Sequence, residues 1–359
     1  MAWTSALRPQ LPALLVAVLC AFLAPVSAQP ADAMASTPVP AVPAVPIGVA
    51  GAVKAVPDSQ NISAFFPKIN GDLTKISWAH AVNNQSLLAE ALNGSVMMME
   101  ADVIMSAAGQ PVMGHPPADS SDLSLLEFLR SVTAFNTDHQ DAPKGIKLDF
   151  KSIEVFEKAL EFLKQNFKDV PAFPVWLNAD ILPGPVNASE SGTIPVDAKR
   201  FLDKAKAEYP DLMLSLGWTT RWGSKLDQSQ VPVDQVKYSP DQVKAMIAAI
   251  KNSAVDQPIT YAVRAAFVAN SLDELKSLLD QTPQASGQAT LSVWSSDDTD
   301  VVDVKQLKKN ILALGKDRVY VDVGEQLAKD LNLSSASATT YASVATTLMA
   351  LMAVMLRAL

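Results

Sequence analysis

The sequence is poor in cysteine, in histidine and in basic side chains, and each shortage narrows the classes of protein it can encode. Its single cysteine, Cys20, lies in an apolar stretch near the N-terminus. One cysteine cannot form an internal disulfide or a multi-thiolate zinc site. The chain carries 29 Lys and Arg against 37 Asp and Glu, for a formal net charge of -8. Because sequence-independent binding of nucleic acid needs a basic surface, we expect no nucleic-acid partner.

Residues 1–28 have the pattern of a secretory signal peptide. Arg8 precedes an apolar run at 11–23, and Ala28 completes a small-residue cleavage pattern. The run is short for a membrane span, so an uncleaved anchor is the less favoured alternative. Cleavage would remove Cys20 and leave a mature chain without thiols. Five Asn-x-Ser triplets fit a glycoprotein on the secretory route, at Asn61, Asn84, Asn93, Asn187 and Asn332.

Both flanks of the central region differ from it in composition. Residues 29–58 are rich in Pro, Ala and Val, which favours an extended, disordered spacer. Residues 334–359 combine small residues, a short polar spacer and a hydrophobic end, the pattern of a GPI-anchor signal in a eukaryote. A tail helix that packs on the protein or a membrane is the alternative. We therefore expect a secreted protein, or one held at the outer face of the plasma membrane through this tail.

The region 59–333 is predicted to form one domain of alternating strands and helices. Several strand-like runs are almost continuously apolar, as expected for strands buried on both faces, and each is followed by a helical pattern. Eight such units predict a (β/α)8 TIM barrel rather than an open sheet. Ser152, Ser239 and Ser271 are candidate N-caps. The strand-like runs are 75–82, 96–105, 145–151, 174–181, 212–219, 259–268, 290–294 and 319–323, and the helices are 85–92, 123–132, 152–167, 197–209, 241–250, 272–279, 304–314 and 325–331.

Carboxylates and a lysine stand at the ends of two runs. Glu100 and Asp102 are two residues apart, so in a strand both point to one face, and Asp149 and Lys151 are related in the same way. A parallel barrel collects strand ends on one face, where three carboxylates could hold Mg²⁺ or Ca²⁺. A solvated strand end and a simple Asp149–Lys151 ion pair are the alternatives.

Two histidines finish apolar runs beside these carboxylates. His80 ends the first run, and a Gly109 hairpin is expected to place His115 beside Glu100 and Asp102. A single histidine there is more often structural, but two beside carboxylates favour acid–base chemistry. The third histidine, His139, lies in a polar stretch and is expected to be exposed and inactive. Further candidates for contact with substrate are Asn83, Asn178, Asp180, Arg264 and Trp294; Arg264 either binds an anion or pairs with a carboxylate of the barrel interior.

The order of His80, Glu100-Ala101-Asp102, a Gly109 turn and His115 resembles the glycerophosphodiester phosphodiesterase superfamily. That resemblance implies a TIM barrel with a divalent metal, a third acidic ligand at Asp149, a lysine at Lys151 and a tryptophan at Trp294. The sequence has His80-Ala81-Val82-Asn83 where that superfamily usually has His-Arg-Gly, so an arginine expected near the phosphate is missing. His-x-Val-Asn and Asp-x-Lys resemble the spider-type phospholipase D branch, whose disulfide cannot form here.

A closer resemblance, to the menorin family, covers most of the folded region. It rests on Trp78-Ala79-His80-Ala81-Val82-Asn83, Glu100-Ala101-Asp102-Val103, Gly114-His115-Pro116-Pro117, Lys147-Leu148-Asp149-Phe150-Lys151 and Leu216-Gly217-Trp218-Thr219. This family implies a phosphodiesterase-like site in a secreted or membrane-associated protein, and some members are discussed as extracellular adhesion partners.

Two functions of different kinds follow. The first is a metal-dependent phosphodiesterase that cleaves a glycerophosphodiester or a phospholipid head group. Glu100, Asp102 and Asp149 would hold the metal and Lys151 would add positive charge; by the resemblance, His80 would act as base or nucleophile and His115 as acid. The second is a non-catalytic cell-surface module that binds an extracellular protein. A barrel glycosidase is weaker, because it leaves both histidines and the lysine unexplained.

Overall fold

In a computed structural model of the chain, the described residues are 56–333 except 168–169, 224–225, 227, 284–286, 297–299 and 301. The predicted signal peptide, most of the predicted proline-rich spacer and the predicted anchor signal at the C-terminal end lie outside the described residues. The described residues all belong to one compact unit. None of their helices has the length and apolar character needed to cross a membrane.

Eight parallel strands form a nearly closed barrel, which confirms the predicted (β/α)8 fold. The strands follow one another around the barrel in chain order, with β3 (Pro111–Met113) paired antiparallel to β2 outside this path. The first and last strands, β1 and β9, come close together, so the barrel is nearly closed. The strands are β1 (Trp78–Ala79), β2 (Met98–Met105), β4 (Gly145–Phe150), β5 (Val175–Pro183), β6 (Met213–Thr219), β7 (Ile259–Arg264), β8 (Thr290–Trp294) and β9 (Val319–Asp322).

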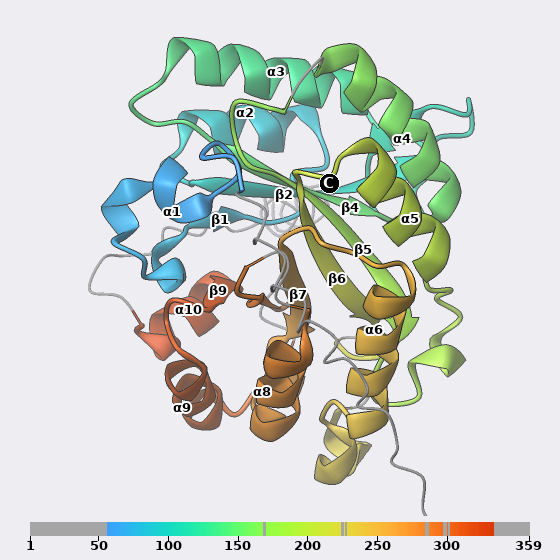
Figure 1. Ribbon diagram of the computed structural model, residues 1–359, viewed down its shortest axis with the longest axis vertical. Coiled ribbons are helices and arrows are strands. Elements are labelled where there is room, and N and C mark those ends of the chain that lie inside the picture. The colour runs from blue at the N-terminus through green and yellow to red at the C-terminus, as the bar shows by residue number, and fades with distance from the viewer. Residues whose placement is uncertain are drawn as a thin grey trace, which may run out of the picture. The chain divides into compact units, whose positions relative to one another are not determined.

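Helices follow the strands and surround them (Figure 1). They are α2 (Gln85–Asn93), α3 (Leu125–Asp138), α4 (Ile153–Asn166), α5 (Ala198–Glu208), α6 (Pro240–Asn252), α8 (Leu272–Gln281), α9 (Val304–Leu314) and α10 (Glu325–Leu331), with short helices α1 (Ile62–Phe65) and α7 (Ala265–Val268). Helix α3 extends six residues beyond the predicted end at 132, because its last turns carry mainly polar residues that a search for apolar spacing does not detect.

Two predicted strands differ in extent from the structure. The run 75–82 is a strand only at Trp78–Ala79, and Lys75 ends a short 3-10 helix. The run 259–268 is not one strand, because β7 ends at Arg264 and residues 265–268 form α7. All four residues of α7 are buried, and a short apolar run does not distinguish a buried strand from a buried helical turn. Ser152 and Ser239 cap α4 and α6 as predicted. Ser271 occupies the N-cap position of α8 as predicted, but its side chain makes no capping hydrogen bond, because its hydroxyl donates to the Phe267 carbonyl and accepts from the Tyr238 N–H.

The inward side chains lie in an apolar layer with a polar layer above it. Trp176 packs edge to face on Trp78 and Tyr320, with ring centroids 5.4 and 4.9 Å away, and Met98 and Met213 join the same buried cluster. Because side chains in a strand alternate between faces, the residue two positions further along also points inward, closer to the C-terminal mouth. The residues in those positions are His80, Glu100, Asn178, Ser215 and Asp322. The alternation of side chains along the strands therefore places a polar site directly above the apolar layer.

Candidate functional site

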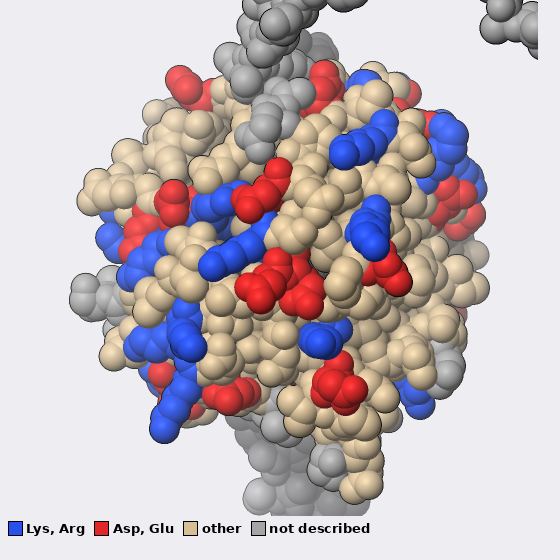
Figure 2. Space-filling model, turned by 60° about the horizontal axis from the view of Figure 1, so that its bottom comes forward, with Lys and Arg blue, Asp and Glu red and all other residues tan. Residues whose placement is uncertain are grey.

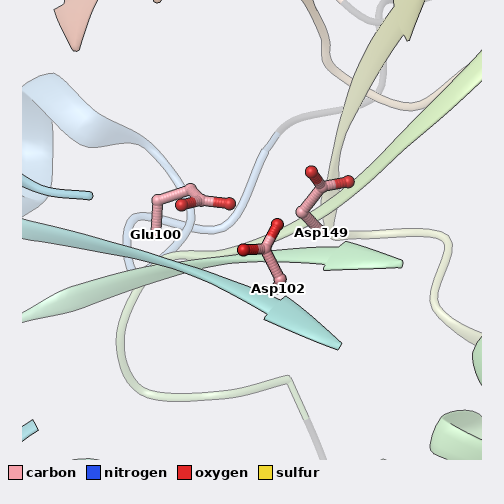
Figure 3. Close-up of side chains that lie close together, drawn as sticks. All are labelled: Glu100, Asp102 and Asp149. Atoms are coloured by element: carbon pink, nitrogen blue, oxygen red, sulfur yellow. The ribbon is translucent and has the colours of Figure 1, made fainter. Parts of the chain in front are cut away.

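Three carboxylates from two neighbouring strands meet at the mouth of the barrel. Glu100 and Asp102 lie on β2, and Asp149 lies on β4 directly opposite Asp102 in the strand register. One oxygen from each of the three lies within 4.8 Å of the others, and their carboxyl groups face a common space (Figure 3). Glu100 and Asp102 are buried and Asp149 is half-buried. The carboxylates predicted to hold a divalent cation are thus brought together.

Lys151 lies between two of these carboxylates. Its Nζ is 2.6 Å from Oδ1 of Asp102 and 2.5 Å from Oδ2 of Asp149. Asn83 also supports Asp102, because its Nδ2 donates to Oδ2 at 2.7 Å and its Oδ1 accepts from the Asp102 N–H at 2.8 Å. Burial by itself raises the pKa of Asp102, but Lys151 outweighs burial and holds the pKa below its usual range. Asp102 is therefore an ionised, firmly positioned carboxylate.

The negative charge of Glu100 is less well compensated than that of Asp102. Its Oε2 accepts a hydrogen bond from the Ala81 N–H at 2.9 Å, and Ala81 adopts a left-handed backbone with φ of 54° to offer it. Burial, together with the negative charge of Asp102, raises the pKa of Glu100 to about 7. A cation at this cluster would offset that charge and favour the ionised carboxylate.

His80 faces a carboxylate that was not among the site residues predicted from the sequence. Its Nδ1 lies 3.1 Å from Oδ2 of Asp322, at the end of β9, and 3.7 Å from Oε2 of Glu100. Burial lowers the pKa of His80, but the charges of Asp322 and Glu100 outweigh it and raise the pKa to about 10. Since Nδ1 faces the carboxylates, Nε2 is the ring nitrogen that can meet a ligand.

Replacing Asp322 with asparagine is expected to lower the pKa of His80, because the substitution removes a negative charge that favours the imidazolium. In the cation-free wild type, the imidazole resonances of His80 should keep their protonated positions across about pH 5 to 8, where an ordinary histidine titrates. In Asp322→Asn the midpoint should move down toward that range. NMR titration of both proteins tests this, and a wild-type midpoint inside the range would contradict the Asp322 assignment.

Lys147 is the second unpredicted member of the site. It is buried, its Nζ lies 3.5 Å from Oδ2 of Asp322, and it sits over the Trp78 ring at 5.2 Å from the centroid. Asp322 and Lys147 could both have been found by the rule that located Glu100 and Asp149. Asp322 lies one residue before the end of the last predicted strand, 319–323, and Lys147 lies two residues before Asp149 on the same face.

His115 follows the predicted hairpin. Strands β2 and β3 pair antiparallel around a turn at Gly109, whose φ is 71°. The Gly114 N–H donates to the Asp102 carbonyl at 2.9 Å, which holds the start of the His115 loop against the carboxylate strand. His115 is exposed, and its Nδ1 lies 2.7 Å from the Pro116 carbonyl oxygen. It is close enough to Asp102 for its charge to help lower the pKa of that carboxyl.

Asn178 and Asp180, both on β5, extend the site around the barrel. Nδ2 of Asn178 donates to Oδ1 of Asp149 at 2.6 Å, and its Oδ1 accepts from the Ser215 hydroxyl at 2.5 Å. Burial and the charge of Asp149 raise the pKa of Asp180 to about 7. A Cβ at Gly217 would lie 2.2 Å from Oδ1 of Asp180, so glycine on β6 makes room for this carboxyl.

Arg264 lies at the rim of the barrel mouth. Its guanidinium forms a two-point ion pair with Asp300 at 2.7 Å, donates to Thr220 and Ser296, and lies over the Trp294 ring at 4.7 Å. Asp300 belongs to the loop after β8 rather than to the barrel interior, so Arg264 ties the loops after β6 and β8 together. Contact of Arg264 or Trp294 with a substrate stays a prediction.

His139 lies apart from this set. It is exposed at the C-terminal end of α3, where its ring stacks on Phe135 with centroids 4.1 Å apart and its Nδ1 lies 3.0 Å from the Phe135 carbonyl oxygen. It provides a natural control histidine.

Comparison with known proteins identifies the family. Residues 72–328 match the Menorin N-terminal domain. The human protein FAM151B is 37% identical over 279 residues, which cover 74% of this chain and 90% of that protein. Among solved structures, a glycerophosphoryl diester phosphodiesterase from Parabacteroides distasonis has a TM-score of 0.41 at 10% identity and covers 75% of this chain and 92% of its own. A chitinase domain from Pyrococcus furiosus has a TM-score of 0.40 at 10% identity and covers 69% and 82%. These structural similarities do not show that this chain is a phosphodiesterase or a chitinase. The domain match and the human relative establish that it belongs to the menorin family.

Proposed function

We propose that this protein is a metal-dependent phosphodiesterase, with the cation held by Glu100, Asp102 and Asp149. The observation that carries the proposal is the convergence of these carboxylates beside Lys151 and a histidine oriented by a buried carboxylate. Oxygen ligands suit Mg²⁺ or Ca²⁺, and such an ion, when bound, would offset negative charge on a phosphate.

The charge balance of the site supports a cation. Five carboxyl groups at the mouth of the barrel face three cationic groups when His80 is protonated, so full ionisation leaves two negative charges uncompensated. Burying uncompensated charge is costly, and the raised pKa values of Glu100 and Asp180 express that cost. One divalent ion would restore neutrality. The acidic groups are Glu100, Asp102, Asp149, Asp180 and Asp322, and the basic ones are Lys147, Lys151 and His80.

The chain's own residues supply the remaining functions. Lys151 offers positive charge next to the carboxylates, and Asn178 fixes Asp149. His80, oriented through Nδ1, presents Nε2 for proton donation in its protonated form, or for attack in its neutral form, which a bound cation would favour by offsetting the negative charge beside the ring. His115 on its exposed loop can protonate the leaving oxygen. On the face that Figure 2 brings forward, acidic and basic side chains are interspersed rather than gathered into a broad basic patch.

Removal of the cation is expected to abolish hydrolysis, and its return to restore it. The full-length chain is treated with a chelator and assayed on glycerophosphodiesters and lysophospholipids before and after Mg²⁺ or Ca²⁺ is added. Calorimetry measures cation binding alongside, with Asp102→Asn as the variant expected to lose it. Turnover that persists in chelator would contradict the metal assignment.

A non-catalytic binding module of the menorin type is the alternative, with an extracellular protein as its partner. Tight cation binding without turnover would favour that role, as would unchanged partner binding in a variant that lacks both His80 and His115. Neither turnover nor cation binding would mean that the carboxylate cluster is structural.

A further inference from the structure

Two loops at the C-terminal end of the barrel line an open pocket at the protein surface. One loop joins β5 to α5, and the other joins β6 to α6. The pocket has a volume of about 240 Å³, and half of its lining residues are aliphatic and half polar, with Arg221 among the polar ones. Pockets that hold a whole small-molecule ligand are typically about 300–1,000 Å³, so this one has room for part of a ligand. Its aliphatic lining consists of Val186, Leu226, Val231 and Pro232.

The two loops are joined at their bases. The Gly184 N–H donates to the Thr219 carbonyl at 3.0 Å. A Cβ at position 184 would lie 2.5 Å from that carbonyl oxygen, so only glycine allows the approach. Val186 and Asn187, which line the pocket, have φ of 59° and 51°. A β-branched residue in the left-handed region is strained, and such strain tends to cluster at ligand-binding sites.

The pocket belongs to the same end of the barrel as the acidic cluster. Strand β5 carries Asn178 and Asp180 into the site and then leads directly into the first pocket loop. The second loop begins next to Thr220, which accepts a hydrogen bond from Arg264 at the mouth. A ligand whose phosphate lies at the acidic cluster and which extends past β5 and β6 would therefore meet this pocket.

The outer parts of the same loops expose aliphatic side chains. Ile194 is 84% exposed on the first loop, and Val233 is 74% exposed on the second. Scattered exposed apolar residues are ordinary. Among the large exposed hydrophobic residues of the described chain, however, these two are the most exposed. Val233 directly follows Pro232 of the pocket lining, and Ile194 lies on the same loop as Val186 and Asn187. Exposed aliphatic side chains around a partly aliphatic pocket suit contact with a lipid.

We propose that this loop pocket receives the aliphatic chain of a lipid phosphodiester whose head group lies at the acidic cluster. The inference rests on the proposed function and deepens it, because it selects a lipid of the lysophospholipid type over a water-soluble glycerophosphodiester. Burial of one methylene group is expected to improve kcat/KM about fourfold when it is complete. Partial burial of a medium-length chain should still give a gain on the order of tenfold or more.

The test measures how kcat/KM depends on the tail. The full-length protein with its cation is assayed on glycerophosphocholine and on its monobutanoyl and monooctanoyl esters, below their micelle concentrations. The wild type should prefer the octanoyl ester, and Val231→Asp should lower the ratio of octanoyl to tail-less kcat/KM about tenfold or more, because a charge in the pocket opposes burial of the chain. Leu312→Asp, at an exposed aliphatic position on α9, is the matched control and should keep the wild-type ratio.

The outcomes separate this inference from the proposed function. Hydrolysis with no dependence on the tail would overturn the pocket assignment and leave the phosphodiesterase standing. If no substrate is hydrolysed, calorimetric titration with the monooctanoyl ester decides: binding weakened by Val231→Asp supports the lipid pocket, and binding that is absent or unaffected overturns it. If Val231→Asp fails to fold by circular dichroism, Val186→Gly replaces it, since glycine accepts the left-handed backbone and removes one aliphatic wall.

Discussion

Replacing His80 with alanine is expected to reduce kcat/KM for phosphodiester hydrolysis by about 10²- to 10⁴-fold, the range typical of a lost proton-transfer group. The Nδ1 atom of this imidazole faces the carboxylates of Asp322 and Glu100, which fixes the orientation of the ring. Its Nε2 atom is therefore available to a ligand. Removing it takes away proton transfer and also a positive charge beside Glu100 and Asp322. Parallel measurements of kcat and KM distinguish loss of chemistry from loss of binding.

His139→Ala is the matched control for this variant. It removes an exposed imidazole that stacks on Phe135, remote from the acidic cluster, and should leave kcat and KM unchanged. Unfolding curves of both variants establish that the fold survives. Undiminished turnover in His80→Ala would remove His80 from the chemistry, and His115 would then have to carry proton transfer.

The fold follows from local patterns, and so does much of the site. Apolar runs bounded by helical spacing located all eight barrel strands, because buried parallel strands are apolar on both faces. Strand alternation points the predicted site residues to one face of each strand, and the parallel barrel gathers the strand ends at one mouth. These residues are Glu100, Asp102, Asp149 and Lys151. The strand end at Arg264 was not predictable in this way, because the buried helix α7 that follows has the same apolar composition as a strand.

The partners within the site depend on long-range geometry. Asp322 meets His80 from 242 residues away in the sequence, where β9 closes the barrel against β1. Strand-end reasoning could have named Asp322 as a candidate, but its pairing with Nδ1 depends on the closure of the barrel. The pairing of Arg264 with Asp300 in a loop likewise depends on loop conformation, which no strand or helix period encodes.

Replacing Lys151 with methionine is expected to destabilise the cation-free protein by about 3–5 kcal/mol and to tighten its binding of Mg²⁺ or Ca²⁺. The ammonium lies within 2.6 Å of Asp102 and 2.5 Å of Asp149, so its loss leaves two closely spaced carboxylates without their counter-ion. A divalent cation no longer meets the repulsion of the ammonium and becomes the replacement counter-ion. Urea unfolding in chelator measures the destabilisation, and calorimetry measures the affinity.

The recovery of stability on adding the cation distinguishes an electrostatic role from a packing role. A ligand at 100 times its dissociation constant stabilises the folded state by about 2.7 kcal/mol, so tighter binding in Lys151→Met should restore more stability than the same cation adds to wild type. Lys158→Met, which breaks an exposed pair with Glu161, is the matched control and should cost only about 0–1 kcal/mol, with no dependence on the cation. If the loss in Lys151→Met is instead insensitive to the cation, Lys151 acts through packing, and the three carboxylates do not form the cation site. If the cation restores stability while turnover stays low, Lys151 has a separate part in handling the phosphate, as expected of an ammonium at the edge of a phosphodiester site.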